Sequence, residues 1–318
     1  MKSIQAGERQ YELVEGWGCL PEGWEWGQVS SVAVDSEDRV HVFTRTKHPY
    51  MVFDRDGRLL DSWGYGIFDD AHAIYITPDD SVWFVDVGAH VVLMFDKHGK
   101  HRLTLGTRGK PSDTEFHDET QAPRGELDYP RYLMNGVHKA AGPFNRPTDV
   151  SVAPSGEIYV SDGYRNARIH KFAADGTLLF SWGEPGNACE LRDTKLEPGR
   201  FHNPHCVLEH NGRVYVADRD NSRVQIFSLE GEFLDMWTGF VRPSDLMVDP
   251  EGKLVAELDD RISILDWDGT VLGRFGSGRS HKPGEFWGPH GLCVDSQGSI
   301  YVGEVQKGAR LQKFARRR

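Results

Sequence analysis

The chain has 318 residues, a formal net charge of −11 at pH 7, 35 glycines and nine tryptophans. This length predicts one large domain over residues 1–318, long enough to bury a substantial core. The acidic balance, with no basic run apart from Arg316–Arg318, argues against a nucleic-acid-binding surface, and no apolar stretch approaches the length of a membrane span.

The cysteines and the first residues bear on cellular location. The four cysteines form no CxxC pair, and residues 1–16 contain no apolar stretch of the kind that a signal peptide carries. We therefore expect a cytoplasmic protein with reduced cysteines, a monomer without nucleic-acid or membrane partners. Cys206 and Cys293 fall in strand patterns and are expected to be buried thiols.

Short apolar strands recur along the chain with a period of about 40 residues. Each repeat opens with one such strand, turns at Asp, Asn, Gly or Pro residues, and continues with a second strand. The first strands begin at Ser30, His72, Thr148, His205, Ser244 and His290. An acidic residue closes five of the six second strands: Asp86, Asp162, Asp218, Glu257 and Glu304. With a third and a fourth strand after these, the pattern predicts an all-β protein, a six-bladed β-propeller.

The two ends of the chain complement each other. The last repeat stops at its third strand, whereas residues 11–14 form an apolar strand that belongs to no repeat and precedes a Gly-Trp-Gly turn. We expect this N-terminal strand to complete the last blade and so to close the ring without an exposed edge.

One spacing is irregular. His72 and Thr148 are 76 residues apart, against 39 between His205 and Ser244, and the excess lies at about 105–146. This Gly-, Pro- and charge-rich insertion, which contains Tyr129, Tyr132 and His138, is expected to act as a lid or binding loop. A degenerate seventh blade is the alternative, although the insertion shows no alternating strands.

Histidine occupies the first position of the first strand in alternate repeats. The second, fourth and sixth repeats carry His72, His205 and His290 there, and the others carry serine or threonine. Equivalent positions in propeller blades lie at equal radius and height, so every second blade would direct one imidazole to a point on the axis. Three neutral imidazoles with an open coordination position suit Zn²⁺, and Fe, Co, Ni and Mn ions are also compatible. The alternative is chance, because the chain has 14 histidines.

The remaining histidines carry no such pattern. His90, His101, His170 and His281 fall on turns or outer strands, so we expect them at the surface.

Two arginines follow the second strands of the first and fourth repeats. In opposite blades, Arg45 and Arg219 would face each other across one mouth and clamp a carboxylate of a small-molecule substrate. Arg219 could instead pair with the acids of its "DRDNSRV" motif. Arg45 departs from the repeat pattern, so no structural role is expected of it. Tyr164, between the blades of His72 and His205, is a candidate general base, and otherwise a packed aromatic residue.

These motifs resemble NHL-repeat propellers, and among them the peptidyl-α-hydroxyglycine α-amidating lyases. The resemblance covers nearly the whole chain and is strongest in "RPTDVSVAPSGEIYVSDGYRNARI", "NPHCVLEHNGRVYVADRDNSRVQIF" and "GPHGLCVDSQGSIYVGE". It implies that His72, His205 and His290 are zinc ligands. It also implies that Tyr164 is the catalytic tyrosine, and that Arg45 and Arg219 are the active-site arginines.

The chain departs from this family at its periphery. The family has a cysteine after the "SDGY" tyrosine, where this chain has Arg165. The resemblance also implies a structural calcium bound by the carbonyls of Val32 and Ile74 and by an aspartate after the third zinc histidine. That residue is Gly291 here, which leaves calcium open.

The resulting expectation is a metal-dependent carbon–nitrogen lyase. It would cleave a carbinolamide, N–CH(OH)–COO⁻, to an amide and a glyoxylate-type aldehyde, on a substrate not restricted to peptides. Two alternatives stay open: another metal-dependent small-molecule hydratase or hydrolase on the same site, and a non-enzymatic NHL propeller that binds other proteins.

Overall fold

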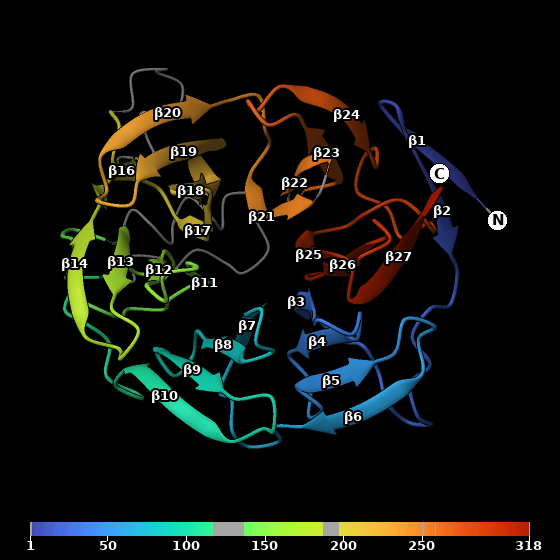
Figure 1. Ribbon diagram of the computed structural model, residues 1–318, viewed down its shortest axis with the longest axis horizontal. Coiled ribbons are helices and arrows are strands. Elements are labelled where there is room, and N and C mark those ends of the chain that lie inside the picture. Colours follow the sequence, from blue (N-terminus) through green and yellow to red (C-terminus); the bar gives the residue numbers. More distant parts are fainter. Residues whose placement is uncertain (1, 117–136, 187–196, 250, 258, 318) are drawn as a thin grey trace. The chain divides into compact units, whose positions relative to one another are not determined.

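The computed structural model describes residues 2–116, 137–186, 197–249, 251–257 and 259–317, and these form strands, turns and one 3₁₀ helix (Figure 1). No α-helix occurs in these ranges. Six sheets of at least four strands confirm the predicted fold class, an all-β six-bladed β-propeller. The blades consist of β3 (Val29–Val34), β4 (Val40–Thr44), β5 (Tyr50–Phe53) and β6 (Leu59–Trp63); β7 (Ala71–Ile76), β8 (Val82–Asp86), β9 (Val91–Phe95) and β10 (His101–Gly106); β11 (Asp149–Val152), β12 (Ile158–Asp162), β13 (Arg168–Phe172) and β14 (Leu178–Trp182); β17 (Pro204–His210), β18 (Arg213–Asp218), β19 (Arg223–Ser228) and β20 (Phe233–Trp237); β21 (Pro243–Asp249), β22 (Gly252–Glu257), β23 (Arg261–Leu265) and β24 (Val271–Phe275); and β25 (Pro289–Val294), β26 (Ile300–Glu304) and β27 (Arg310–Arg317) with β2 (Arg9–Val14).

Two compact units make up the chain. Unit 1 consists of Met1–Phe84, Phe95–Lys100 and Ser244–Arg318, and unit 2 consists of Val85–Met94 and His101–Pro243. The residues of the second blade are divided between them. We describe each unit by itself.

The N-terminal strand closes the last blade in unit 1, as predicted. β2 pairs antiparallel with β27, with Leu13 opposite Phe314 (Figure 1). A further strand that the sequence did not suggest, β1 (Ser3–Ala6), pairs with the outer side of β2. Tyr11, Phe275, Phe286 and Phe314 belong to one buried apolar cluster that includes residues of β1, β2 and β22–β27. The N-terminal strands are therefore part of the core of unit 1.

In unit 2, the apolar core lies between the blades β11–β14 and β17–β20. Tyr159, Ile169, Val214 and Phe227 are almost fully buried there and belong to one cluster with Phe201. The second and third strands of these blades are buried along nearly their whole length, whereas the outer strands β14 and β20 are exposed or half-buried. A short parallel pair, β15 (Glu184–Pro185) with β16 (Arg200–Phe201), precedes β17.

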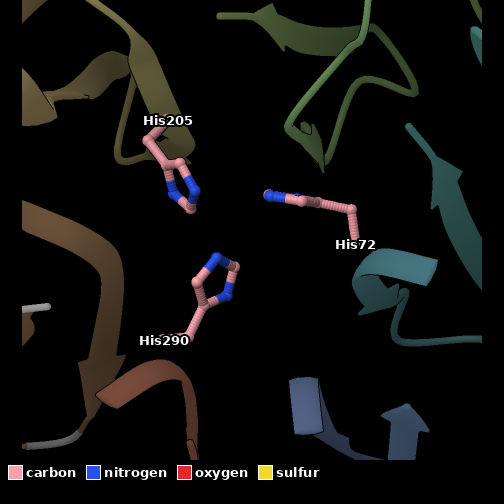
Figure 2. Close-up of side chains that lie close together, drawn as sticks. All are labelled: His72, His205 and His290. Carbon is pink, nitrogen blue, oxygen red and sulfur yellow. The ribbon is translucent and has the colours of Figure 1, made fainter. Parts of the chain in front are cut away.

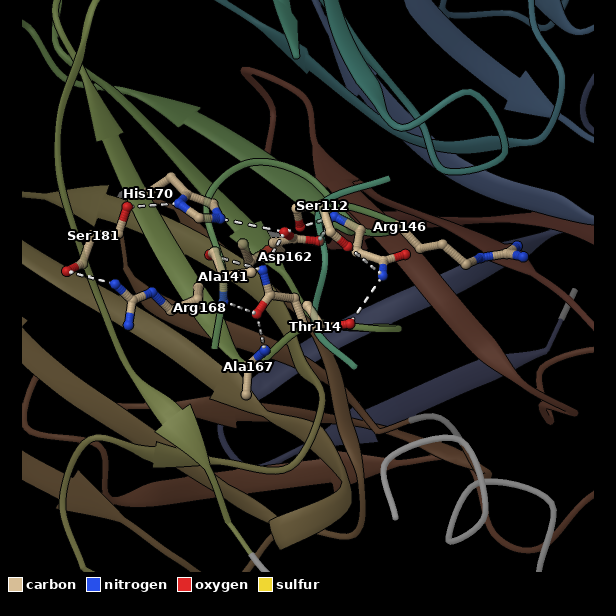
Figure 3. Close-up of polar contacts among 12 residues, drawn as sticks. Ser112, Thr114, Ala141, Arg146, Asp162, Ala167, Arg168, His170 and Ser181 are labelled. Atoms are coloured by element: carbon tan, nitrogen blue, oxygen red, sulfur yellow. Dashed lines mark hydrogen bonds and ion pairs between the residues drawn. The ribbon is translucent and has the colours of Figure 1, made fainter. Parts of the chain in front are cut away.

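The second strands end at the predicted acids, and each acid is buried. Asp162 accepts hydrogen bonds from the Asn145 backbone N–H (2.9 and 3.0 Å), from Asn166 Nδ2 (2.9 Å) and from His170 Nε2 (3.3 Å; Figure 3). A buried carboxylate requires such partners, because burial removes its water. Through such hydrogen bonds, Asp162 connects the end of the second strand to the neighbouring backbone and side chains.

His170 corrects one expectation. It was expected at the surface, but its ring is fully buried, between Asp162 and Ser181 Oγ, which lies 2.7 Å from Nδ1. The same position of the third strand holds Gln225, Ser263 and Gln312, and each donates to the acid of its own blade. His170 is therefore a repeat-typical partner of the blade acid. Of the others, His101 and His281 are exposed, and His90 is half-buried.

The described flanks of the insertion lie side by side in unit 2. Residues 117–136, with Tyr129 and Tyr132, lie outside the described residues. On the two flanks, the Ser112 N–H donates to Phe144 O (2.8 Å) and Asn145 Nδ2 donates to Thr114 Oγ1 (3.0 Å; Figure 3). Thr114 Oγ1 donates in turn to the carbonyl of Arg165, the residue after Tyr164 (2.8 Å). Both ends of the insertion are thus anchored beside the candidate base.

Candidate active site

Two of the blade acids also bind the backbone that leads into the first strand of their own blade. The carboxylates of Asp218 and Glu304 accept the backbone N–H groups of His202 and Trp287, both at 2.7 Å. Each of these N–H groups belongs to the residue three positions before a candidate ligand, His205 or His290. The sequence therefore orients these imidazoles through buried carboxylates that tie down the backbone leading to them.

In unit 1, His72 and His290 lie together. They are 1% and 5% exposed, at the starts of β7 and β25, and their ring centroids are 4.9 Å apart (Figure 2). His290 Nδ1 lies 2.7 Å from the backbone carbonyl oxygen of Ser30, so Nδ1 carries the proton and donates it. The lone pair is then on Nε2, which is the arrangement that metal-binding histidines have.

Arg45 lies beside His72 but also has structural partners. Its Nε is 3.1 Å from both the carbonyl oxygen of Ala71 and Asp70 Oδ1, and Nη1 is 3.2 Å from Gln28 Oε1. The expectation that Arg45 has no structural role is therefore wrong, because it binds the residue before His72. Its side chain is 26% exposed, so the guanidinium also reaches solvent.

In unit 2, Tyr164 and His205 lie together. Tyr164 Oη is 3.2 Å from His205 Nε2, and the two rings meet edge-on with centroids 5.6 Å apart. His205 is the third imidazole drawn in Figure 2 and is 2% exposed. Gly163 permits this approach, since a Cβ there would lie 2.3 Å from the carbonyl oxygen of Pro204. The "SDGY" motif thus requires its glycine to bring the phenol to the histidine.

Arg219 joins this pair from the 3₁₀ helix η2 (Arg219–Asn221). It is buried, its Cζ lies 5.5 Å from the centre of the Tyr164 ring, and its guanidinium binds Asp220 through Nε and Nη2, both at 3.3 Å. Burial acts to lower the pKa of Arg219, but the charge of Asp220, the hydrogen bonds to it and the interaction with Tyr164 together outweigh burial and raise the pKa. Arg219 therefore stays charged. It has the acidic partner that the sequence suggested, and it lies beside Tyr164.

The predicted site residues thus come together in two groups. His72, His290 and Arg45 form the group in unit 1, and His205, Tyr164 and Arg219 form the group in unit 2. That Arg45 and Arg219 face each other stays a prediction. Sequence reasoning missed Asp220, which also binds Arg242 and Asn203, because its partner Arg242 lies 22 residues downstream.

Asp220 is expected to make stability depend on pH. Burial acts to raise the pKa of its carboxyl, but the charges of Arg219 and Arg242 outweigh burial and hold the pKa at about 2, against an ordinary 3.8. Because the pKa is lower in the folded protein, the ionised carboxylate stabilises the fold by about 2 kcal/mol at any pH above about 4. This stabilisation disappears as the pH falls from 4 toward 2. Asp220→Asn should therefore lower the melting temperature at pH 7 and differ little from wild type near pH 2. An equal difference at both pH values would contradict this.

The calcium that the resemblance implied does not fit this chain. Gly291 offers no carboxylate, and a Cβ there would lie 2.7 Å from Ser31 Cα. A longer side chain would collide with the neighbouring strand β3, so the residues present do not form that site.

The cysteine expectations hold where the structure describes them. Cys206 and Cys293 are buried thiols, and burial raises the pKa of Cys293. Cys189 lies outside the described residues. Among the described residues, no helix is long and apolar enough to cross a membrane.

Comparison with known proteins supports the same resemblance. A family model described as the NHL repeat matches residues 144–172, 201–227 and 286–314. The chain is 31% identical to human NHL repeat-containing protein 3 over 327 residues, which cover 96% of this chain and 84% of that protein. It is 27% identical to Drosophila melanogaster peptidyl-alpha-hydroxyglycine alpha-amidating lyase 2 over 339 residues, covering 92% and 72% of the two chains.

A solved structure supports the fold alone. A streptogramin B lyase structure superposes with a TM-score of 0.61 over 99% of this chain and 100% of that chain, at 12% identity. The family model and the relatives confirm the resemblance to NHL-repeat propellers, and amidating lyases are among these relatives.

Proposed function

Because the chain belongs to the family of NHL-repeat proteins, we propose that it is a metal-dependent carbon–nitrogen lyase. It cleaves a carbinolamide, R–CO–NH–CH(OH)–COO⁻, to the amide R–CO–NH₂ and glyoxylate. One observation carries the proposal: Tyr164 Oη lies 3.2 Å from His205 Nε2 while Arg219 lies over the tyrosine ring. A phenol, an imidazole and a fixed cation in contact are the groups that this reaction needs.

The metal site of the proposal consists of His72, His205 and His290. All three are buried, and the donor set fits a transition metal, since His290 directs its Nδ1 proton to a carbonyl and keeps the Nε2 lone pair. Zn²⁺ suits three neutral imidazoles best, and other divalent transition metals are compatible. When bound, the metal supplies Lewis-acid polarisation of the substrate hydroxyl oxygen.

The chain's own residues move the proton and hold the substrate. Tyr164 Oη accepts the proton of the hydroxyl group, the C–O bond becomes the aldehyde carbonyl, and the C–N bond breaks. The same proton returns to the departing nitrogen, so the amide leaves neutral and the atoms balance. Arg45 and Arg219 bind the carboxylate, and the positive charge of Arg219 also stabilises the negative charge that the Tyr164 oxygen carries before it accepts the proton.

An assay for glyoxylate tests this function. Purified protein is incubated with N-benzoyl-α-hydroxyglycine and, separately, with N-benzoylglycine, which lacks the hydroxyl group. The lyase releases benzamide and glyoxylate in equal amounts from the first substrate and leaves the second intact. Release of benzoate from both would indicate a hydrolase. No product from either, with a bound protein partner, would indicate an interaction propeller.

Arg45→Ala tests the carboxylate clamp. A charge-assisted contact with a desolvated carboxylate is worth roughly 2–4 kcal/mol, so kcat/KM should fall by about 30- to 1,000-fold. Loss of the bonds to Ala71 and Asp70 should lower the melting temperature as well. Arg39→Ala is the matched control, because Arg39 also pairs with an acid in unit 1, Asp35. Equal loss of activity in both variants would mark Arg45 as structural only.

A further inference from the structure

Asp220 connects two arginines and an amide in unit 2. Its Oδ1 accepts from Arg219 Nε (3.3 Å) and Arg242 Nε (3.0 Å), and its Oδ2 accepts from Arg219 Nη2 (3.3 Å) and Asn203 Nδ2 (3.0 Å). The side chain is 5% exposed. A buried carboxylate with several charge-assisted bonds has one orientation, and it imposes that orientation on its partners.

The arginine that Asp220 binds is the one beside the candidate base. Two of the guanidinium nitrogens of Arg219 are held side-on by the carboxylate, and Cζ lies 5.5 Å from the Tyr164 ring centre. The Asp220 carboxylate binds Arg219, Arg242 and Asn203, and of these three residues Arg219 lies over the Tyr164 ring.

Backbone hydrogen bonds also connect the helix η2, which contains Arg219 and Asp220, to the strand that carries His205. The Arg219 N–H donates to Asn203 O (3.2 Å), and the Asp220 N–H donates to His202 O (3.0 Å). Asn203 has a left-handed backbone with a φ of 67°, two residues before His205. The helix η2 and the start of β17 therefore form one rigid piece, which carries both the histidine and the acid that orients the arginine.

We propose that Asp220 is a positioning residue of the proposed lyase: by sharing its carboxylate between Arg219 and Arg242, it holds the Arg219 guanidinium over Tyr164, where it recognises the substrate carboxylate. This inference rests on the proposed function and adds a determinant of its specificity. Arg242 binds the oxygen Oδ1 that Arg219 Nε also uses, so it limits how far the carboxylate can rotate.

Kinetics on two substrates separate positioning from stability. The preference for carboxylate is the ratio of kcat/KM for N-benzoyl-α-hydroxyglycine to that for its methyl ester, in which the charge is masked. Asp220→Asn keeps the shape but removes the charge, and this ratio should fall about tenfold or more. Asp220→Glu, which restores the charge, should recover most of it. If Asp220→Asn slows both substrates equally, the proposal fails.

Asp249→Asn is the matched control. Asp249 is equally buried, with a side-chain exposure of 5%, and pairs with Arg9 in unit 1 at 2.5 Å. Breaking this pair should lower the melting temperature and leave the ratio unchanged. A similar fall of the ratio in both variants would overturn the proposal.

A crystal structure of Asp220→Asn gives a test without turnover. Arg219 should leave its place over the Tyr164 ring, and an unmoved guanidinium would overturn the proposal. If wild-type protein releases no glyoxylate, the proposed function fails, and this structure alone decides whether Asp220 positions Arg219.

Discussion

Tyr164→Phe is expected to lower kcat by about 100-fold or more and to leave the melting temperature nearly unchanged. The phenyl ring keeps the edge-on contact with His205 and the place under Arg219, so packing is retained. Only the hydroxyl group 3.2 Å from His205 Nε2 is removed, and with it the acceptor of the substrate proton. General acid–base catalysis contributes about 10²- to 10⁴-fold, which sets the size of the effect. The measurement is glyoxylate release at saturating substrate.

Tyr159→Phe is the control for this variant. Tyr159 lies on β12 of the same blade, is fully buried, and donates its hydroxyl only weakly, to Leu229 O at 3.4 Å. Loss of the Tyr159 hydroxyl group should leave kcat near the wild-type value. Near-normal turnover by Tyr164→Phe would remove Tyr164 from the mechanism and favour the hydrolase alternative.

His205→Ala is expected to remove most of the bound metal. One transition-metal ion per chain should copurify with wild-type protein, and the variant keeps only two of three imidazole ligands. An open site with three protein ligands has no other donor to replace a lost one, so affinity should fall steeply. Metal content per chain, measured by mass spectrometry after chelator-free purification, gives the result.

His170→Ala is the matched control for metal binding. His170 is equally buried and lies in the same unit, but it binds Asp162 and Ser181. This variant should lose stability and keep its metal. Metal content that is unchanged in His205→Ala, or equally lost in both variants, would contradict the proposed ligand set.

Periodicity made most of the fold predictable. The second strands end as expected at Asp86, Asp162, Asp218, Glu257 and Glu304. The same acid position recurs in five repeats, so the repeats could be aligned with one another and the strand ends located. Pairing of β2 with β27 followed from a missing strand at one end of the pattern and an unassigned strand at the other. β1 was missed since its four residues have no counterpart in the other repeats.

The side-chain partners were less predictable. His170 was expected at the surface because its strand was predicted to be an outer strand. Other repeats also have a polar residue at this position of the third strand, namely Gln225, Ser263 and Gln312. This recurrence could have indicated a buried partner of the blade acid. Arg45 breaks the repeat pattern, yet it has the structural partners Gln28 and Asp70, and all three residues lie outside the strands. Contacts between loops leave no periodic trace in the sequence.

The most direct measurement of the central claim compares metal-free and zinc-loaded protein on N-benzoyl-α-hydroxyglycine. The chain is stripped with a chelator, checked for an unchanged circular dichroism spectrum, and reloaded with one equivalent of Zn²⁺. We expect the stripped protein to release little glyoxylate, and the reloaded protein to release benzamide and glyoxylate in equal amounts. Equal turnover with and without metal would contradict a metal-dependent lyase, and so would a reloaded protein that releases neither product.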